Sequence, residues 1–453
     1  MKIIIEGAGE VGSHLAKMLR REANEVTVID NDKERLDRLT AYADVEAIEG
    51  NPSSISVLKE AGVAKADLFI AVYPFATQEV NIVGALLAKQ LGAAKVVARI
   101  DDEEFLSPEN RLTTKEMGID LMFCPEKIAA DEIVSQIKHS SSSETMDFAH
   151  GKLQISVFKI DESSPIIDLR LSEFVSRLDV NTATLFRIIA ISRGNDTMIP
   201  ETDTKFQFGD LVFVIATNTG MPEVVKLFGI NSIAIKSAMI LGGSEIGGMV
   251  AASLGRQFGN VKIIDKSRER CIELSEKLPD NVQIVNGDGR DSDFLFEEDI
   301  KSYDSFLALT GRDETNVLAC VVAKKFGVAR TIAEVENIEY LRLAEEMGVD
   351  AVINKKLLTA GRIFKFTLSG RARFVKYMSG TNAEVIEYTV APGSAITKGT
   401  LREIDFPKKA IIGGIIRGSE PFIAVGSTRI EAYDRVAVFT LEEAISEIDK
   451  FFK

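Results

Sequence analysis

The chain has 453 residues, of which 45% are hydrophobic and 27% charged, and its formal net charge is −14. This composition is typical of a folded globular protein, and the length exceeds what one hydrophobic core usually supports, so several domains are expected. The acidic balance excludes general binding to nucleic acid or to a bare anionic membrane surface, because both need a basic face. No stretch of 18 residues is free of charge, so no membrane-spanning helix is predicted.

A glycine-rich loop follows the first apolar run, Ile3–Ile5, and leads into a helical pattern. The loop residues are Gly7, Ala8, Gly9, Glu10, Val11 and Gly12. In such a loop the first glycine makes a tight turn, the second lets the backbone approach a pyrophosphate, and the third lets the helix pack on the strand. Asp30 ends the next apolar run, where a carboxylate can accept hydrogen bonds from ribose hydroxyls, which favours NAD, ADP or ATP over a ligand with a 2′-phosphate.

The same pattern recurs 235 positions later in the chain. The second loop consists of Gly242, Gly243, Ser244, Glu245, Ile246 and Gly247, and Asp265 takes the place of Asp30. Ser244 adds a side chain where the backbone should approach a phosphate, although its hydroxyl could donate to that phosphate. Whether the second loop binds a nucleotide or only preserves helix packing stays open at this point.

The repeat extends beyond the loops and defines the organisation of the chain. Short apolar runs alternate with helical segments in each copy, which predicts an α/β fold with two Rossmann-like, doubly wound parallel sheets. Each copy is followed by a small α+β module, with the polar run Ser140–Ser143 as the first connection. The expected domains are residues 1–135, 144–228, 236–358 and 371–453.

Two further pairs of positions lie where the nucleotide should bind, at the carboxyl ends of predicted strands. Tyr73 and Thr310 end corresponding apolar runs, and backbone contacts to a ligand are expected there. Arg99 ends the next run of the first copy and could pair with phosphates, with a neighbouring subunit or in a surface salt bridge, whereas its counterpart is Glu334.

Catalytic machinery is not evident in the sequence. The three histidines, His14, His139 and His150, lie at a helix start and in the polar connection, and the three cysteines have neither a disulfide nor a zinc spacing. Hydride transfer usually needs a positioned acid or base and a substrate domain. We therefore predict a protein that is not an enzyme and holds no metal.

The run Ile3–Gly12, Val28–Asp30, Glu49–Asn51 and Glu79–Asn81 resembles the regulator-of-potassium-conductance (RCK) domains of the bacterial and archaeal Trk and Ktr systems. The domain order is similar to that of tandem RCK regulators over essentially the full chain. The resemblance implies RCK N-terminal and C-terminal domains in alternation, with NAD(H), ATP or ADP as ligands. Besides the loops and aspartates, it implies binding roles for Asn51, Tyr73, Arg99, Asp288, Thr310 and Glu334.

The resemblance also implies a place in the cell. It predicts a cytoplasmic protein, peripheral on the inner face of the membrane, that forms a homo-oligomeric ring, expected to be a tetramer. The ring would contact an integral membrane potassium-transporting subunit of the TrkH or TrkG type. The alternatives are an RCK-type regulator of another potassium channel or antiporter, and an NAD-dependent dehydrogenase.

Overall fold

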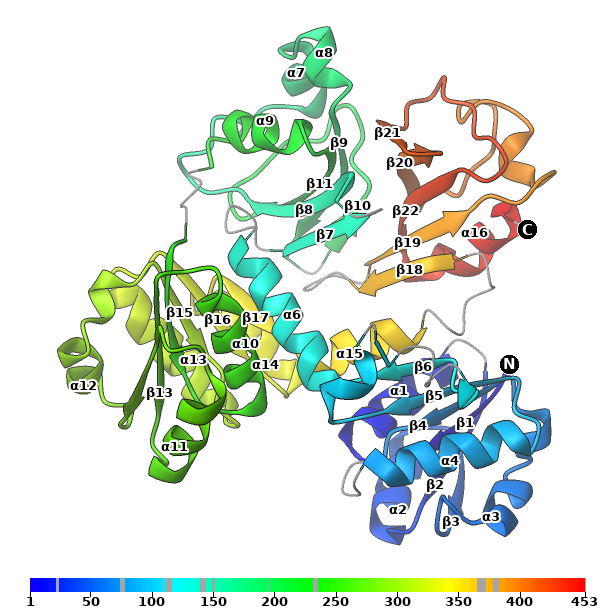
Figure 1. Ribbon diagram of the computed structural model, residues 1–453. Coiled ribbons are helices and arrows are strands. Elements are labelled where there is room, and N and C mark those ends of the chain that lie inside the picture. The colour runs from blue at the N-terminus through cyan, green and yellow to red at the C-terminus, as the bar shows by residue number, and fades with distance from the viewer. Residues whose placement is uncertain are drawn as a thin grey trace. The chain divides into compact units, whose positions relative to one another are not determined.

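The computed structural model describes residues 1–21, 24–73, 78–107, 109–110, 116–138, 144–148, 151–194, 196–230, 235–364, 372–377 and 383–452. The polar run Ser140–Ser143, His139 and His150 lie outside these ranges. Four sheets organise the described chain, two of them parallel and two antiparallel (Figure 1). The predicted α/β class with duplicated Rossmann-like sheets is confirmed.

The first parallel sheet has the strand order β3-β2-β1-β4-β5-β6. Its strands are apolar because both faces of a parallel sheet are covered, and Ile3, Ile4 and Ile5 of β1 are fully buried. The elements of this part are β1 Lys2–Glu6, α1 Glu10–Arg21, β2 Glu25–Asp30, α2 Lys33–Tyr42, β3 Glu46–Glu49, α3 Ile55–Glu60, β4 Leu68–Ala71, α4 Gln78–Gln90, β5 Lys95–Arg99, β6 Leu121–Phe123 and α6 Pro125–Lys138.

The second parallel sheet repeats this order as β14-β13-β12-β15-β16-β17. The elements are β12 Ser237–Leu241, α10 Glu245–Gly255, β13 Asn260–Asp265, α11 Arg268–Lys277, β14 Val282–Asn286, α12 Ser292–Glu297, β15 Ser305–Ala308, α13 Asp313–Lys325, β16 Arg330–Glu334, α14 Ile338–Glu346, β17 Ala351–Ile353 and α15 Lys355–Phe364.

The two small modules are five-stranded antiparallel sheets of the orders β10-β9-β11-β8-β7 and β18-β19-β22-β20-β21. The first contains β7 Glu144–Phe148, β8 Leu153–Lys159, α7 Leu171–Ser176, α8 Val180–Ala183, β9 Phe186–Arg193, β10 Asp196–Met198, β11 Leu211–Thr217 and α9 Gly220–Leu227. The second contains β18 Ala372–Tyr377, β19 Ala383–Thr389, β20 Ala410–Arg417, β21 Glu420–Ile423, β22 Arg435–Leu441 and α16 Ile445–Phe452.

Contacts divide the chain into two units that do not follow the order of the sequence. The first unit is Met1–Ala129 together with helix α15, which comes after the second parallel sheet but packs on α1. The second unit holds the rest, including the end of α6, where Gln136 accepts a hydrogen bond of 3.1 Å from Arg330. Each copy therefore contacts a helix that the other copy carries in sequence.

Within the second unit the two antiparallel sheets share one hydrophobic core. Phe213 of β11 and Phe439 of β22 meet in it, with ring centroids 5.6 Å apart. Both rings are buried, so this pair couples the two small modules through dispersion and the removal of apolar surface from water.

Replacement of Phe439 by Ala should destabilise the second unit by about 3 to 5 kcal/mol, because a buried ring is lost and a cavity remains. Phe208→Ala is the matched control, since Phe208 is 63% exposed and its loss should change stability by only about 0.5 kcal/mol. Urea unfolding followed by circular dichroism measures both. Equal midpoints for the two variants would contradict a shared core.

Candidate nucleotide site

The first glycine loop is shaped by contacts that only glycine permits. Gly7 has a φ of +107°, and a Cβ on it would lie 2.7 Å from Cα of Tyr73. A Cβ on Gly12 would lie 1.9 Å from the carbonyl oxygen of Gly7. The predicted roles of the first and third glycines, a tight turn and close helix–strand packing, are thus visible in the geometry.

Asp30 holds this loop at the end of β2 through hydrogen bonds. Its Oδ2 accepts a 2.6 Å hydrogen bond from the amide of Ala8, and its Oδ1 accepts a 2.9 Å bond from the amide of Asp32. An ionised carboxylate offers about four lone-pair positions, so these two bonds leave acceptor capacity for ribose hydroxyls. Asp30 lies where the fingerprint requires it.

The second loop repeats this arrangement almost atom for atom. Asp265 Oδ2 accepts from the amide of Gly243 at 2.6 Å, and its Oδ1 accepts from the amide of Ser267 at 2.8 Å. Gly242 has the same φ as Gly7, +107°. A Cβ on Gly247 would lie 2.1 Å from the carbonyl oxygen of Gly242, just as a Cβ on Gly12 would crowd that of Gly7.

The hydroxyl of Ser244 makes two hydrogen bonds within the protein. The hydroxyl donates to the carbonyl of Leu309 at 2.8 Å and accepts from the amide of Gly247 at 3.1 Å, which makes Ser244 the N-cap of α10. Arg270 also occupies this loop: its Nε donates to the Gly243 carbonyl at 2.5 Å and its Nη2 pairs with Glu245 at 2.9 Å. Gly9, at the position of Ser244 in the first copy, has no side chain that could make such bonds.

Several predicted site residues can offer a ligand only their main chain. The side chains of Ala8, Val11 and Ile246 are buried, at 8% exposure or less. Gly9 has no side chain. The groups that both loops can present to an anion are therefore main-chain amides at the N-termini of α1 and α10.

The ends of β4 and β15 are each held by an asparagine, Asn81 in the first copy and Asn316 in the second. Asn81 is part of the motif that carries the family resemblance, but neither residue was among the expected site residues. Asn81 Oδ1 accepts from the amide of Tyr73 at 2.7 Å. Asn316 accepts from the amide of Thr310 at 3.0 Å and donates to the carbonyls of Thr310 and Glu334, both at 2.8 Å. The recurrence of this asparagine in both copies was the available signal for its positioning role.

Asn51 and Asp288 lie in exposed turns after the third strand of each sheet. Asn51 accepts from the amide of Ser53 at 2.9 Å. Asp288 is paired with Arg290, whose hydrogen bonds lower the pKa of Asp288 to about 2. The first copy has a neutral amide at this corner, whereas the second has an ion pair.

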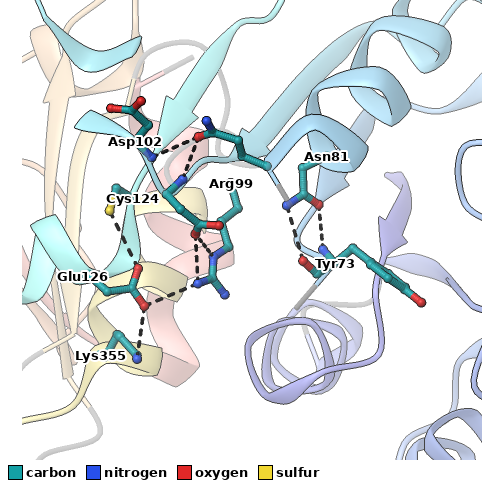
Figure 2. Close-up of polar contacts among 9 residues, drawn as sticks. Tyr73, Asn81, Arg99, Asp102, Cys124, Glu126 and Lys355 are labelled. Atoms are coloured by element: carbon teal, nitrogen blue, oxygen red, sulfur yellow. Dashed lines mark hydrogen bonds and ion pairs between the residues drawn. The ribbon is translucent and has the colours of Figure 1, made fainter. Parts of the chain in front are cut away.

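Arg99 lies at the end of β5 in a cluster of charges (Figure 2). It contacts Asp101 at 3.1 Å and Glu126 at 3.4 Å, and Glu126 also contacts Lys355 of α15 at 3.3 Å. Burial opposes ionisation of Glu126, but Arg99 and Lys355 outweigh it and lower the pKa of Glu126. The counterpart of Arg99 in the second copy is Glu334, which is almost fully buried at the end of β16. The two copies therefore differ in charge at this position.

Helix α15 also reaches the glycine loop itself. Lys356 pairs with Glu10 of that loop at 2.9 Å. Sequence reasoning missed Glu126, Lys355 and Lys356, because their partners are far away in the chain and no spacing signals the pairing.

The described part of the chain contains no cluster of three or more metal-ligating side chains and no helix long and apolar enough to cross a membrane. Cys124, Cys271 and Cys320 are free and buried. Burial is also the main cause that raises the pKa of the Cys124 thiol to about 11, which keeps it protonated at neutral pH.

Fold and loops together define a class: a protein built from two Rossmann-like domains, each followed by a small antiparallel module. The TrkA-N domain family matches residues 3–125 and 238–355, and the TrkA-C domain family matches residues 155–229 and 385–453. The chain belongs to the TrkA family of Trk potassium uptake proteins, as the resemblance predicted.

Full-length relatives support this assignment. The chain is 34% identical to the Trk system potassium uptake protein TrkA homolog of Archaeoglobus fulgidus and 32% identical to homolog 1 of Methanosarcina mazei, in each case over 100% of both chains. It is 31% identical to the TrkA protein of Haemophilus influenzae, over 100% of this chain and 99% of the relative.

Solved structures support the fold. The GsuK channel bound to NAD superposes with a TM-score of 0.61 at 17% identity, covering 100% of this chain and 78% of the channel. The isolated GsuK RCK domain gives a TM-score of 0.60 at 16% identity, covering 100% of this chain and 94% of the domain. At this identity the likeness speaks for the fold alone.

Glu126→Gln should lower the stability of the first unit by about 1 to 3 kcal/mol at pH 7, the usual cost of losing charge-assisted hydrogen bonds. Because the folded-state pKa of Glu126 is lowered, its contribution is full above the unfolded value of about 4.3 and is lost as pH falls through the folded value. Thermal unfolding from pH 7 to pH 3 should show the difference shrinking below about pH 4.3.

The control for this series is Glu49→Gln, a change of the same kind at an exposed position at the end of β3 in the same unit. It should leave the transition within about 0.5 kcal/mol of the parent at each pH. A Glu126→Gln deficit that persists unchanged at pH 3 would show that shape, and not charge, accounts for the loss.

Proposed function

We propose that the protein is the regulatory subunit of a Trk-type potassium uptake system and senses NAD(H), ATP or ADP through its two Rossmann-like domains. The observation that carries the proposal is the duplicated loop: in both copies an aspartate holds the loop amide at 2.6 Å, beside glycines whose places a side chain would block. Such a cradle leaves helix N-terminal amides for phosphates and a carboxylate for ribose.

The comparisons support the same class of ligand without assigning it to this chain. The GsuK channel, which shares the fold, has been solved with NAD and with ADP. In this chain Asp30 or Asp265 would orient the ribose, the loop amides would hold the phosphates, and Tyr73, Arg99, Asn51 or their counterparts Thr310, Glu334 and Asp288 would line the rest of each site. The role proposed for the protein is binding without chemical turnover.

In this proposal the chains assemble into a homo-oligomeric ring, a tetramer, on the cytoplasmic face of the membrane. The ring contacts a potassium-conducting subunit of the TrkH or TrkG type. A nucleotide changes potassium flux only if it binds one ring conformation more tightly than another, because a ligand bound equally by both shifts nothing. A coupling free energy of about 1 to 3 kcal/mol would change the open population several-fold to about a hundredfold.

Calorimetric titration with NADH, NAD⁺, ATP and ADP tests the sites. Asp30→Ala and Asp265→Ala should each weaken one binding event by about tenfold to a hundredfold, the effect of losing charge-assisted hydrogen bonds. Asp203→Ala, at an exposed position, is the control and should bind like the parent. The isosteric Asp→Asn changes separate lost charge from lost folding.

Absorbance of NADH, followed in the same samples, tests the enzyme alternative. Binding without oxidation of NADH supports the sensor. Turnover with an added metabolite would instead establish a dehydrogenase, and unchanged affinity in both aspartate variants would remove these residues from the sites.

Reconstitution with a TrkH-type membrane subunit in potassium-loaded vesicles tests the partner. Added nucleotide should change potassium flux at least several-fold with the parent chain. The double variant Asp30→Ala/Asp265→Ala should still associate with the membrane subunit but lose this response. If neither the parent chain nor the double variant associated with the membrane subunit, a different channel or antiporter would be favoured as the partner.

A further inference from the structure

The two aspartates proposed to bind ribose differ in their exposure to solvent, although their hydrogen bonds to the loop amides match. Asp30 and Asp265 hold their loops with matching hydrogen bonds, of 2.6 Å in each case. Yet Asp30 is completely buried, whereas Asp265 is partly exposed. A ribose hydroxyl must contact the carboxylate to be recognised, so accessibility of this side chain decides whether a nucleotide can dock.

Tyr73 lies close to the first aspartate. Its hydroxyl donates a hydrogen bond to Oδ1 of Asn31, the residue directly after Asp30. Tyr73 follows β4 and Asn31 follows β2, and β1 lies between these strands in the sheet. The tyrosine side chain therefore crosses the carboxyl edge of β1, over the start of the glycine loop.

Two other observations place the tyrosine at this position. A Cβ on Gly7 would lie 2.7 Å from Cα of Tyr73, so the residue is tight against the loop. Burial and then the charge of Asp30 raise the pKa of the Tyr73 hydroxyl, which reflects their proximity. Arg35 also lies beside this aspartate, with its Nη1 4.0 Å from Oδ2 of Asp30.

The second copy has no equivalent bridge among its described contacts. Thr310 replaces Tyr73, and its hydroxyl donates to Asn316 at 2.6 Å, away from the aspartate. Lys266 replaces Asn31. The partial exposure of Asp265 agrees with these two substitutions.

We propose that the Tyr73–Asn31 bridge is a latch over the first nucleotide site, so that an adenosine nucleotide reaches Asp30 only when the tyrosine side chain swings away. This inference rests on the proposed function of the loop. The bridge lowers the fraction of chains competent to bind, and the apparent affinity falls in proportion. The first site is consequently slower to load than an unlatched site with the same loop.

Stopped-flow binding of 1,N6-etheno-ADP, whose ribose is unmodified, tests the latch. The full chain with Asp265→Ala reports on the first site alone, and adding Asp30→Ala should abolish the signal. Tyr73→Phe and Asn31→Ala should each speed association about threefold to tenfold, the range set by one net hydrogen bond. The double variant should be no faster than either single one, because both remove the same bond.

Tyr42→Phe is the matched control, because Tyr42 is 57% exposed, and its association rate should equal that of the parent. A reciprocal variant makes the test independent of changes at the first site. In an Asp30→Ala chain, Thr310→Tyr with Lys266→Asn should slow loading of the second site.

Three results would overturn the inference or its premise. Association rates of Tyr73→Phe and Asn31→Ala within twofold of the parent, with binding still dependent on Asp30, would refute the latch and leave the proposed function intact. Weaker binding by Tyr73→Phe would show that the hydroxyl contacts the ligand, which also refutes it. Failure of the parent to bind either etheno-ADP or NADH would overturn the proposed function and the latch together.

Discussion

The hydrogen bond from a loop amide to the aspartate that ends the second strand is the interaction on which each candidate site depends. It joins the end of the second strand to the turn after the first, at 2.6 Å in both copies. The bond fixes a turn that only glycine can make, and that turn sets where the following helix begins. Loss of the carboxylate would therefore disturb both the proposed ligand contact and the placement of the helix amides.

The sequence was sufficient for the fold class and the loops, because both depend on local patterns: apolar runs, glycines at fixed spacing and a repeat that shows each feature twice. It was insufficient for long-range pairings. Lys355 and Glu126 are 229 positions apart, and nothing in their spacing indicates that they meet. The bond of the Ser244 hydroxyl is another example: its acceptor, the carbonyl of Leu309, follows β15 and lies 65 positions away.

The two copies have kept the same framework and changed what surrounds it. Glu6, at the end of β1, is fully buried, neither of its oxygens has a hydrogen-bond partner among the described residues, and burial raises its pKa well above the usual range. A Cβ on Gly84 would lie 1.9 Å from this carboxyl group. The second copy has Leu241 and Ala319 at these places, so a glutamate beside a glycine in the first copy corresponds to two apolar residues in the second.

The exchanged helices have an evolutionary consequence. Helix α15 belongs in sequence to the second copy but packs on α1, and its lysines neutralise Glu10 and Glu126 of the first. A protein with one copy of this unit could complete the same packing only by borrowing the helix from another chain. When both copies stand in one chain, the helix is supplied within the same molecule. This packing then no longer depends on protein concentration. Cutting the chain between its copies would place α15 and its packing partner α1 on separate chains.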